Sequence, residues 1–197
     1  MAGAIYRQKS VLVPEEEMGV NQRNRRLRGI MGLIKMQVQS YAPVEVVYEI
    51  AHQILDFVDS MPHIKNIRKL EENKEHTYSK TEWVLDVPLP KILGEVSWIK
   101  DAHWNDTVRK CDISLNRDSR GIVKKIKGLW KFTPCPEGTD MSMNMDLTVK
   151  HFLIGSNITM MIDTLFRKNM ESLMLAIGAA AEKRVNANGT KLQGLRF

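Results

Sequence analysis

The sequence predicts an α+β fold, in which a curved antiparallel sheet of about six to seven strands wraps around one long C-terminal helix. Apolar and polar residues alternate with period two in successive segments between residues 34 and 149. From Ser156 nearly to Arg184, the apolar residues instead recur at helical spacing. A helix so long and so apolar on one side is not stable alone, so we expect it to pack on the sheet.

The first elements are predicted in chain order. Residues 34–38 alternate as a half-buried strand does. Pro43 suits the first turn of a helix, whose apolar face runs over residues 47–58 and which Pro62 ends. A less regular strand is expected over residues 64–73.

Five more strands are expected from alternation, over residues 81–87, 94–98, 107–115, 122–132 and 141–149. Proline, glycine and asparagine separate them in loops at residues 88–90, 116–121 and 134–138. The last strand has the cleanest alternation. Ser156 is the expected N-cap of the long helix that follows.

The 197 residues divide into one domain and two extensions. Residues 1–31 have no sustained period and carry four arginines within residues 21–28, so we interpret them as a basic N-terminal extension. Residues 32–185 form the domain. Residues 186–197 begin with turn-forming asparagine and glycine and are expected to be a C-terminal tail.

Composition favours a cytoplasmic protein. The chain has no run of 18 apolar residues and no signal-peptide pattern at its start, and its two cysteines cannot form a disulfide framework. The net charge is +6. We interpret the arginine-rich segment as a solvated arm. The alternatives are contact with an anionic membrane or binding of nucleic acid, through Arg23 to Arg28 with Lys124, Lys125, Lys127 and Lys131.

Several motifs punctuate this order of elements: Ser40-Tyr-Ala-Pro-Val-Glu-Val-Val-Tyr48, Asp56-Phe-Val-Asp-Ser-Met-Pro62, Gly128-Leu-Trp-Lys-Phe-Thr-Pro134, Glu137-Gly-Thr139 and the region of Asn169. Over residues 33–184 they resemble the START-related superfamily, which includes pollen-allergen-like lipid binders, polyketide aromatase/cyclases and coenzyme-Q-binding proteins. The chain is most similar to the polyketide cyclase/dehydrase and lipid-transport branch. The resemblance implies a helix-grip fold, with an elongated ligand cavity between the sheet and the last helix.

The expected cavity walls are rich in adaptable side chains. Seven of the twelve methionines lie between Met141 and Met174, on the strand and helix that would form two walls. Methionine suits a surface that adapts to a ligand, although the same side chains could simply be core. The candidate ligand-binding residues are Trp83, Trp98, Arg109, Trp130, Met143, Met145, Met161 and Leu165.

Two kinds of candidate stand out among these residues. Strand parity places Arg109 on the inner face, where its guanidinium would hold an anionic group of the ligand or form a structural ion pair. Trp83, Trp98 and Trp130 share the inner parity of three strands. Their rings would stack on a flat ligand or fill the cavity themselves.

No catalytic residue, metal ligand or cofactor is expected. The sequence has no Gly-x-Ser-x-Gly elbow, phosphate-binding loop or dinucleotide fingerprint. The five histidines (His52, His63, His76, His103 and His151) are too widely spaced for a helical zinc site. His151 is the best-placed titratable group, but a lone histidine beside an apolar face is usually structural.

The resemblance and the apolar walls together favour a carrier or chaperone for a lipid-like or polycyclic small molecule. The alternative is a cofactor-independent polyketide aromatase/cyclase, a lyase-type enzyme. An enzyme would need a general acid or base within reach of its substrate, whereas a carrier needs only an apolar lining and one anchor.

Because no amphipathic period runs through the N-terminal extension, we expect that deleting residues 1–28 lowers the melting temperature by only a few degrees, corresponding to about 1 kcal/mol. Thermal denaturation followed by circular dichroism measures this shift. Loss of soluble expression would show instead that the extension packs on the sheet or mediates a dimer.

Overall fold

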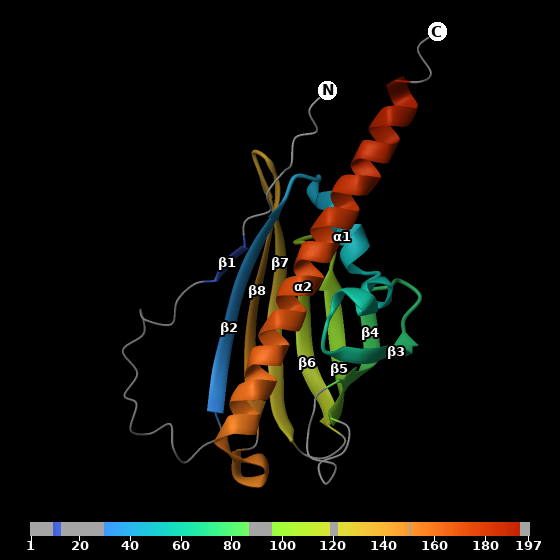
Figure 1. Ribbon diagram of the computed structural model, residues 1–197. Coiled ribbons are helices and arrows are strands. Elements are labelled where there is room, and N and C mark those ends of the chain that lie inside the picture. The colour runs from blue at the N-terminus through green and yellow to red at the C-terminus, as the bar shows by residue number, and fades with distance from the viewer. Residues whose placement is uncertain (1–9, 13–29, 87–95, 119–121, 150, 194–197) are drawn as a thin grey trace.

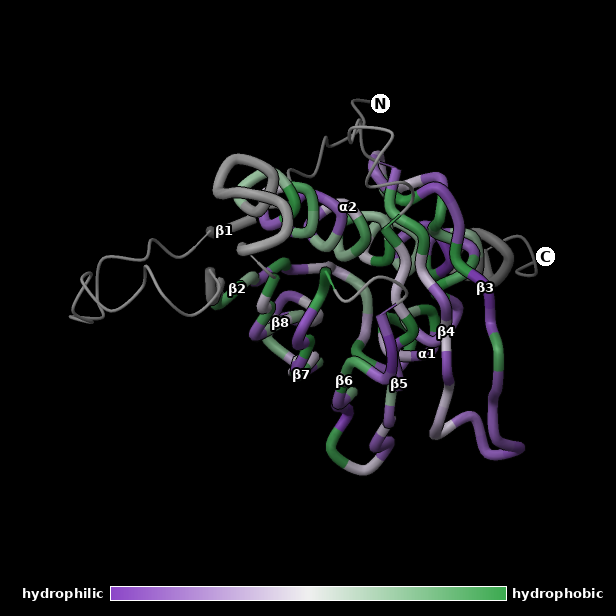
Figure 2. Tube along the Cα trace, turned by 90° about the horizontal axis from the view of Figure 1, so that it is seen from below, coloured by the Kyte–Doolittle hydropathy of each residue, from purple (hydrophilic) through white to green (hydrophobic). Residues whose placement is uncertain are grey.

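The computed structural model describes residues 10–12, 30–86, 96–118, 122–149 and 151–193 (Figure 1). They form one antiparallel sheet of eight strands, in the order β1-β2-β8-β7-β6-β5-β4-β3, with one long helix across it. Viewed end-on, the sheet curves beneath this helix (Figure 2). The predicted α+β fold, a curved antiparallel sheet with a long C-terminal helix, is therefore confirmed.

The elements have the following bounds: β1 (Ser10–Leu12), β2 (Ile30–Ser40), α1 (Val44–Ala51), the 3-10 helix η3 (Ile54–Ser60), β3 (Ile64–Glu72), β4 (Tyr78–Leu85), β5 (Val96–Asn105), β6 (Lys110–Asp118), β7 (Val123–Cys135), β8 (Gly138–Val149) and α2 (His151–Gln193). Most of the expected strands agree with these bounds within a few residues. β1 adds a short edge strand to β2, with Ser10 opposite Val38.

Three boundaries of the predicted helices are wrong. The helix expected over residues 43–58 is divided into α1 and η3, with a turn at His52 between them. The long helix begins at His151, so Ser156 is a residue of its early turns and not its N-cap. It also continues to Gln193 through the segment expected to be a tail, because extending an existing helix costs far less than starting one.

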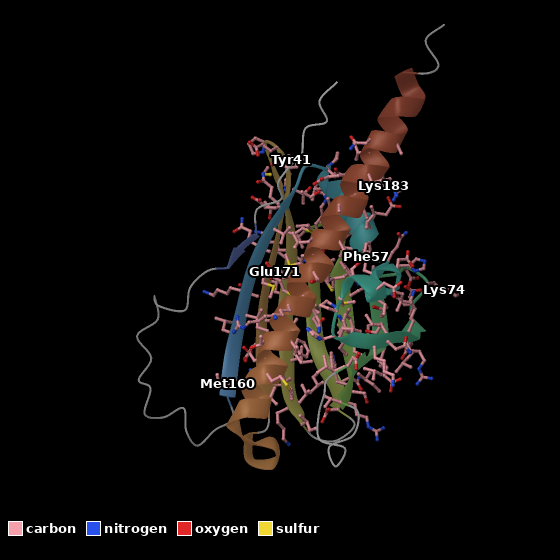
Figure 3. All side chains as sticks on the ribbon, viewed as in Figure 1. Tyr41, Phe57, Lys74, Met160, Glu171 and Lys183 are labelled. Atoms are coloured by element: carbon pink, nitrogen blue, oxygen red, sulfur yellow. The ribbon has the colours of Figure 1, made fainter. Side chains whose placement is uncertain are left out.

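The core lies between α2 and the inner face of the sheet (Figure 3). On β2 and β8, Met36 lies opposite Met143 and Ile34 opposite Met145, and all four side chains are buried. The buried face of α2 consists of Ile162, Leu165, Phe166, Met170, Leu173, Met174, Ile177 and Ala181. The alternation of the strands and the stripe of the helix therefore meet in one continuous core.

Polar contacts fix α2 to the rest of the fold. The backbone N–H of Tyr41 donates to the Glu182 carboxylate at 2.9 Å, and the buried hydroxyl of Ser40 lies 3.2 Å from the same oxygen. Nearer the middle of the helix, the buried Asn169 side chain accepts a hydrogen bond from the His63 N–H at 3.0 Å. These contacts hold the chain on either side of α1 and η3 against α2, beside the site described below.

The turn between β7 and β8 requires glycine at position 138. Gly138 has φ +147°, a conformation that L-residues rarely adopt. A Cβ there would overlap the carbonyl oxygen of Ser40 and lie 2.8 Å from Tyr41 Cα. Because both neighbours are backbone atoms, a side chain cannot be accommodated by a change of rotamer.

We therefore expect Gly138→Ala to lower the free energy of unfolding by at least about 2 kcal/mol. Gly128→Ala is the matched control, because a Cβ at that position meets its nearest neighbours at an ordinary 3.5 Å. The control should change stability by less than about 1 kcal/mol. Urea denaturation of both variants measures the difference, and equal losses would contradict this account.

Candidate functional site

A cleft of about 690 Å³ lies where α1, η3, the end of β3 with its turn to β4, and the turn between β5 and β6 meet. Its size is typical of small-molecule sites. It is lined by Glu45, Tyr48, Glu49, His52, Gln53, Leu55, Asp56, Lys69, Glu72, Glu75, His76, Asp106 and Arg109. Three segments far apart in the sequence, residues 45–56, 69–76 and 106–109, therefore build it.

The cleft is acidic although the chain as a whole is basic. Its lining carries six carboxylates against the two cations Lys69 and Arg109, whereas the whole chain has a net charge of +6. Carboxylates accept hydrogen bonds from hydroxyl groups and repel anions. The mouth of the site therefore favours a neutral ligand with hydroxyl groups over an anionic one.

Tyr48 forms the aromatic floor of the cleft. Its hydroxyl donates to Asp106 at 2.9 Å, and its ring meets the His52 and Phe132 rings edge-on. Burial raises the pKa of the Tyr48 hydroxyl, and the hydrogen bond to Asp106 raises it further. The phenol is therefore neutral at physiological pH.

His52 lies between the cleft and a second, inner pocket and lines both. That pocket has room for about one water, at about 20 Å³, and is lined by His52, Ile54, Ser79, Thr81, Lys100, Ala102, Trp104, Cys111, Ile113 and Trp130. His52 lines both spaces and stacks on Trp104, with ring centroids 3.9 Å apart. Burial lowers the pKa of His52, so its imidazole is neutral at pH 7.

Lys100 is the unusual residue of the inner pocket. It lies on the inward side of β5, its side chain is only 8% exposed, and its Nζ lies 4.3 Å from the centre of the Trp83 ring. Among the described residues, no carboxylate is within 4.0 Å of this Nζ. The contact with the ring stabilises the ammonium only in part. A buried cation without a counter-charge is costly to the fold.

Burial lowers the pKa of Lys100 to about 8, against the opposing influence of Cys111. Cys111 is buried as well, and burial raises the pKa of its thiol to about 12. It is therefore neutral at physiological pH and cannot compensate the ammonium. Within the part of the chain that the structure describes, Cys111 is the acidic group whose charge would affect Lys100, and it is uncharged at physiological pH. The lowered pKa means that Lys100 loses its proton more easily than an ordinary lysine.

A second polar group of this pocket also lacks a partner. Trp130 is 1% exposed, and its indole N–H is buried without a hydrogen bond. Buried N–H groups normally have an acceptor. Lys100 and Trp130 thus bring an ammonium without a carboxylate partner and an unpaired N–H to the lining of one small pocket.

The residues expected to line a ligand cavity lie in the interior, except for Arg109. Trp83 stacks on Trp98 with ring centroids 6.1 Å apart, and Trp98 contacts the Phe166 ring of α2. Trp130 lies opposite Met143 on the neighbouring strand. Met145 and Leu165 are buried, and Met161 is half-buried on α2. Trp130 also lines the inner pocket.

The strand placement of Arg109 is wrong. Residues 106–109 form the turn between β5 and β6, and Val108 N–H donates to the Asn105 side chain within it. Arg109 has φ +47°, and its guanidinium donates to Glu45 of α1 at 2.7 Å on the rim of the cleft. Asn105 and Asp106 are typical turn residues, and the turn that they open continues through Arg109, so β6 begins at Lys110 and not at Thr107.

Lys100 was not among the site residues predicted from the sequence, although the alternation of its strand indicates that it points inward. Val96 and Trp98 were assigned to the inner face, and the same alternation continues through Lys100 and Ala102. The expected strand ended at residue 98, whereas β5 continues to Asn105. A lysine that shares the inward face of a strand with buried apolar residues is the sequence signal that points to this site.

Other expectations fall partly outside the described residues. The arginine-rich segment 21–28 lies there, and so does the side chain of His151, which is the first residue of α2. Lys124, Lys125, Lys127 and Lys131 are exposed on β7. Over the described ranges no helix is long and apolar enough to cross a membrane, and no group of three His, Cys, Asp or Glu could hold a metal.

Comparison with known proteins bears on the fold. Residues 41–174, more than half of the chain, match the family described as polyketide cyclase / dehydrase and lipid transport. No curated protein matches the sequence.

Solved structures share the fold at low identity. The Zhui aromatase/cyclase from Streptomyces sp. R1128 is 19% identical with a TM-score of 0.67, covering 81% of this chain and 98% of that one. A START superfamily protein from Mycobacterium smegmatis is 17% identical with a TM-score of 0.55, covering 78% and 97%. The di-domain ARO/CYC StfQ of the steffimycin pathway is 15% identical with a TM-score of 0.65, covering 83% of this chain and 54% of that one.

The buried charge of Lys100 predicts how stability changes with pH. The folded pKa is near 8 and the unfolded value is near 10.5, so the folded state disfavours the proton by about 3 kcal/mol. This penalty is complete below pH 8 and disappears as the pH rises to 10.5. Lys100→Met should therefore be more stable than the natural protein by up to about 3 kcal/mol at pH 7, and the difference should shrink above pH 8.

Urea denaturation at a series of pH values from 7 to 10 measures this difference. Lys127→Met is the matched control, because Lys127 is exposed on the outer side of β7. A difference between Lys100→Met and the natural protein that stays constant from pH 7 to 10 would contradict the assignment.

Proposed function

The chain belongs to the polyketide cyclase / dehydrase and lipid transport family, and from this premise we propose that it binds a neutral small molecule with a lipid-like or polycyclic apolar body and a carbonyl oxygen. We propose that it acts as a carrier or chaperone of this molecule. The oxygen contacts Lys100 in the inner pocket, and the apolar body extends past His52 toward the cleft. No cofactor is required for this role.

The observation that carries the proposal is the buried ammonium of Lys100 without a counter-charge. A lysine in that position destabilises the free protein, so its presence is more easily explained by a ligand than by folding. A carbonyl oxygen would accept hydrogen bonds from both Lys100 and the unpartnered N–H of Trp130. One ligand atom would thus satisfy two buried donors.

The acidic cleft supports a neutral ligand over an anionic one. Six carboxylates face the entrance, and they would repel a free carboxylic acid before it reached Lys100. They would accept hydrogen bonds from phenolic or alcoholic hydroxyl groups on the same ligand. An apolar ring system with hydroxyl groups and a carbonyl group fits both spaces.

The apolar part of the ligand is accommodated by movement of the side chains around the inner pocket. The inner pocket holds only about 20 Å³, so a ligand that reaches Lys100 must displace part of its lining. The neighbouring wall is rich in methionine, since Met143 lies beside Trp130 and Met36 beside Met143. Methionine side chains repack at low cost. We propose that Trp83, Trp98, Met145, Met161 and Leu165 contact the bound ligand in this way.

A second candidate function is a cofactor-independent polyketide aromatase/cyclase. It is favoured by the lowered pKa of Lys100, because about one such side chain in ten is neutral at pH 7 and can act as a base. A neutral amine beside a carbonyl group can take a proton from the adjacent carbon, which is the first step of aldol closure. Conversion of a synthetic poly-β-ketone to an aromatic product would distinguish this enzyme from a carrier.

The carrier proposal predicts a loss of affinity on removing Lys100. Acetylnaphthalene and isopropenylnaphthalene have nearly the same shape, and only the first has a carbonyl oxygen. Lys100→Met should weaken binding of acetylnaphthalene about tenfold to a hundredfold, since a hydrogen bond to a charged group contributes roughly 1.5–3 kcal/mol. Binding of isopropenylnaphthalene should barely change. Quenching of tryptophan fluorescence measures both affinities.

Arg109→Met is the control for this experiment, because Arg109 is a cation of the cleft that is already paired with Glu45. It should alter either affinity less than about threefold. If Arg109→Met weakens ketone binding and Lys100→Met does not, the anchor is Arg109 and the proposal fails. Native mass spectrometry of the purified protein would identify a ligand that it retains.

A further inference from the structure

We propose that Lys100 also binds its ligand covalently, by forming a reversible imine between its Nζ and the carbonyl carbon of an aldehyde or ketone. This proposal rests on the proposed function, because it assumes that the carbonyl group reaches the inner pocket. It goes further by assigning a chemical step to Lys100 and by restricting the ligand to carbonyl compounds.

The position of Lys100 meets the requirements of a nucleophilic amine. Its side chain is 8% exposed and lies against the Trp83 ring, and none of the described carboxylates holds its ammonium in the charged form. An amine in an apolar pocket loses its proton more easily than one in water, as the lowered pKa of Lys100 indicates. Lysines that are paired with acids, such as Lys80 with Glu71, lack this property.

The neighbours of Lys100 also suit this chemistry. The unpartnered N–H of Trp130 is available to donate to the carbonyl oxygen, which gains negative charge when the amine attacks. Cys111 lines the same pocket, but burial keeps it a thiol, so it is a poor competitor for the carbonyl carbon. Lys100 is the only lysine among the residues that line this pocket.

The step balances without any further reagent. The neutral amine attacks the carbonyl carbon, the C–N bond forms, and a proton passes from nitrogen to oxygen to give a carbinolamine. The hydroxyl group then leaves as water as the C=N bond forms and the nitrogen loses its second proton. One water is released, next to the His52 side chain that lines both this pocket and the solvent-facing cleft.

Reductive trapping tests the proposal. Naphthaldehyde and sodium cyanoborohydride are added to the full-length protein at pH 8, and the imine is reduced to a stable naphthylmethyl amine. At this pH the neutral fraction of Lys100 is about a hundredfold larger than that of an ordinary lysine. We expect one adduct per chain, located on Lys100 by peptide mass spectrometry and formed at least about tenfold faster than any other adduct.

Two variants control for unrelated effects. Lys127→Met removes an exposed lysine and should leave the rate of the single adduct unchanged. Lys100→Arg keeps the positive charge but cannot form an imine, and it should abolish the rapid adduct. Circular dichroism establishes that both variants are folded. If Lys100→Arg does not fold, two measurements on the natural protein test the proposal instead. They are the residue that carries the adduct and the pH dependence of the rate at which the adduct forms. The rate should rise through pH 8.

The outcomes separate this proposal from the proposed function. Naphthylmethanol has the same ring system without a carbonyl group, so its binding reports the apolar site alone. If naphthylmethanol binds and naphthaldehyde gives no rapid adduct on Lys100, the covalent step is wrong and the carrier function stands. If neither compound binds, the carrier function fails for this class of ligand. Adducts spread evenly over exposed lysines would overturn the covalent proposal in either case.

Discussion

The ammonium of Lys100 is buried in an apolar interior with no counter-charge among the described residues, and much of the site is arranged around it. Desolvation of this charge is the largest local cost that the fold carries there, and it explains the lowered pKa of Lys100. The Trp83 ring offsets part of the cost, and the buried thiol of Cys111 offsets none of it as long as it keeps its proton. An oxygen atom supplied by a ligand is the simplest group that would complete the pocket.

Two features of the fold bury Lys100 in the inner pocket: the alternating faces of strand β5 and the helices that cover this end of the sheet. β5 alternates side chains between the two faces of the sheet, so Lys100 points inward together with Trp98 and Ala102. The register of β5 with β6 shifts between Ile99 and Lys100, which is the kind of irregularity found beside functional residues. The helices α1 and η3 cover that end of the sheet and leave His52 between the pocket and the acidic cleft.

Much of the fold follows from the sequence, whereas the site follows from it only in part. The alternation of apolar and polar residues correctly placed Trp83, Trp98 and Trp130 in the interior. The alternation is informative because shifting a strand by one residue would move all of its side chains to the opposite face of the sheet. The same reasoning failed at Arg109, where an asparagine turn interrupts the alternation, and it stopped one step short of Lys100. The cleft could not be predicted, since α1 and two turns distant in the chain meet only in the folded protein.

The most direct test of this account is the pKa of Lys100 itself, measured by nuclear magnetic resonance of the carbon next to Nζ in protein with labelled lysine. Lys100→Arg identifies the signal. In the free protein we expect this carbon to titrate near pH 8, well apart from the exposed lysines near 10.5, and to lose its separate titration when a carbonyl ligand is bound. If Lys100 titrates near pH 10.5 in the free protein, its charge is compensated or solvated, and the central claim is wrong.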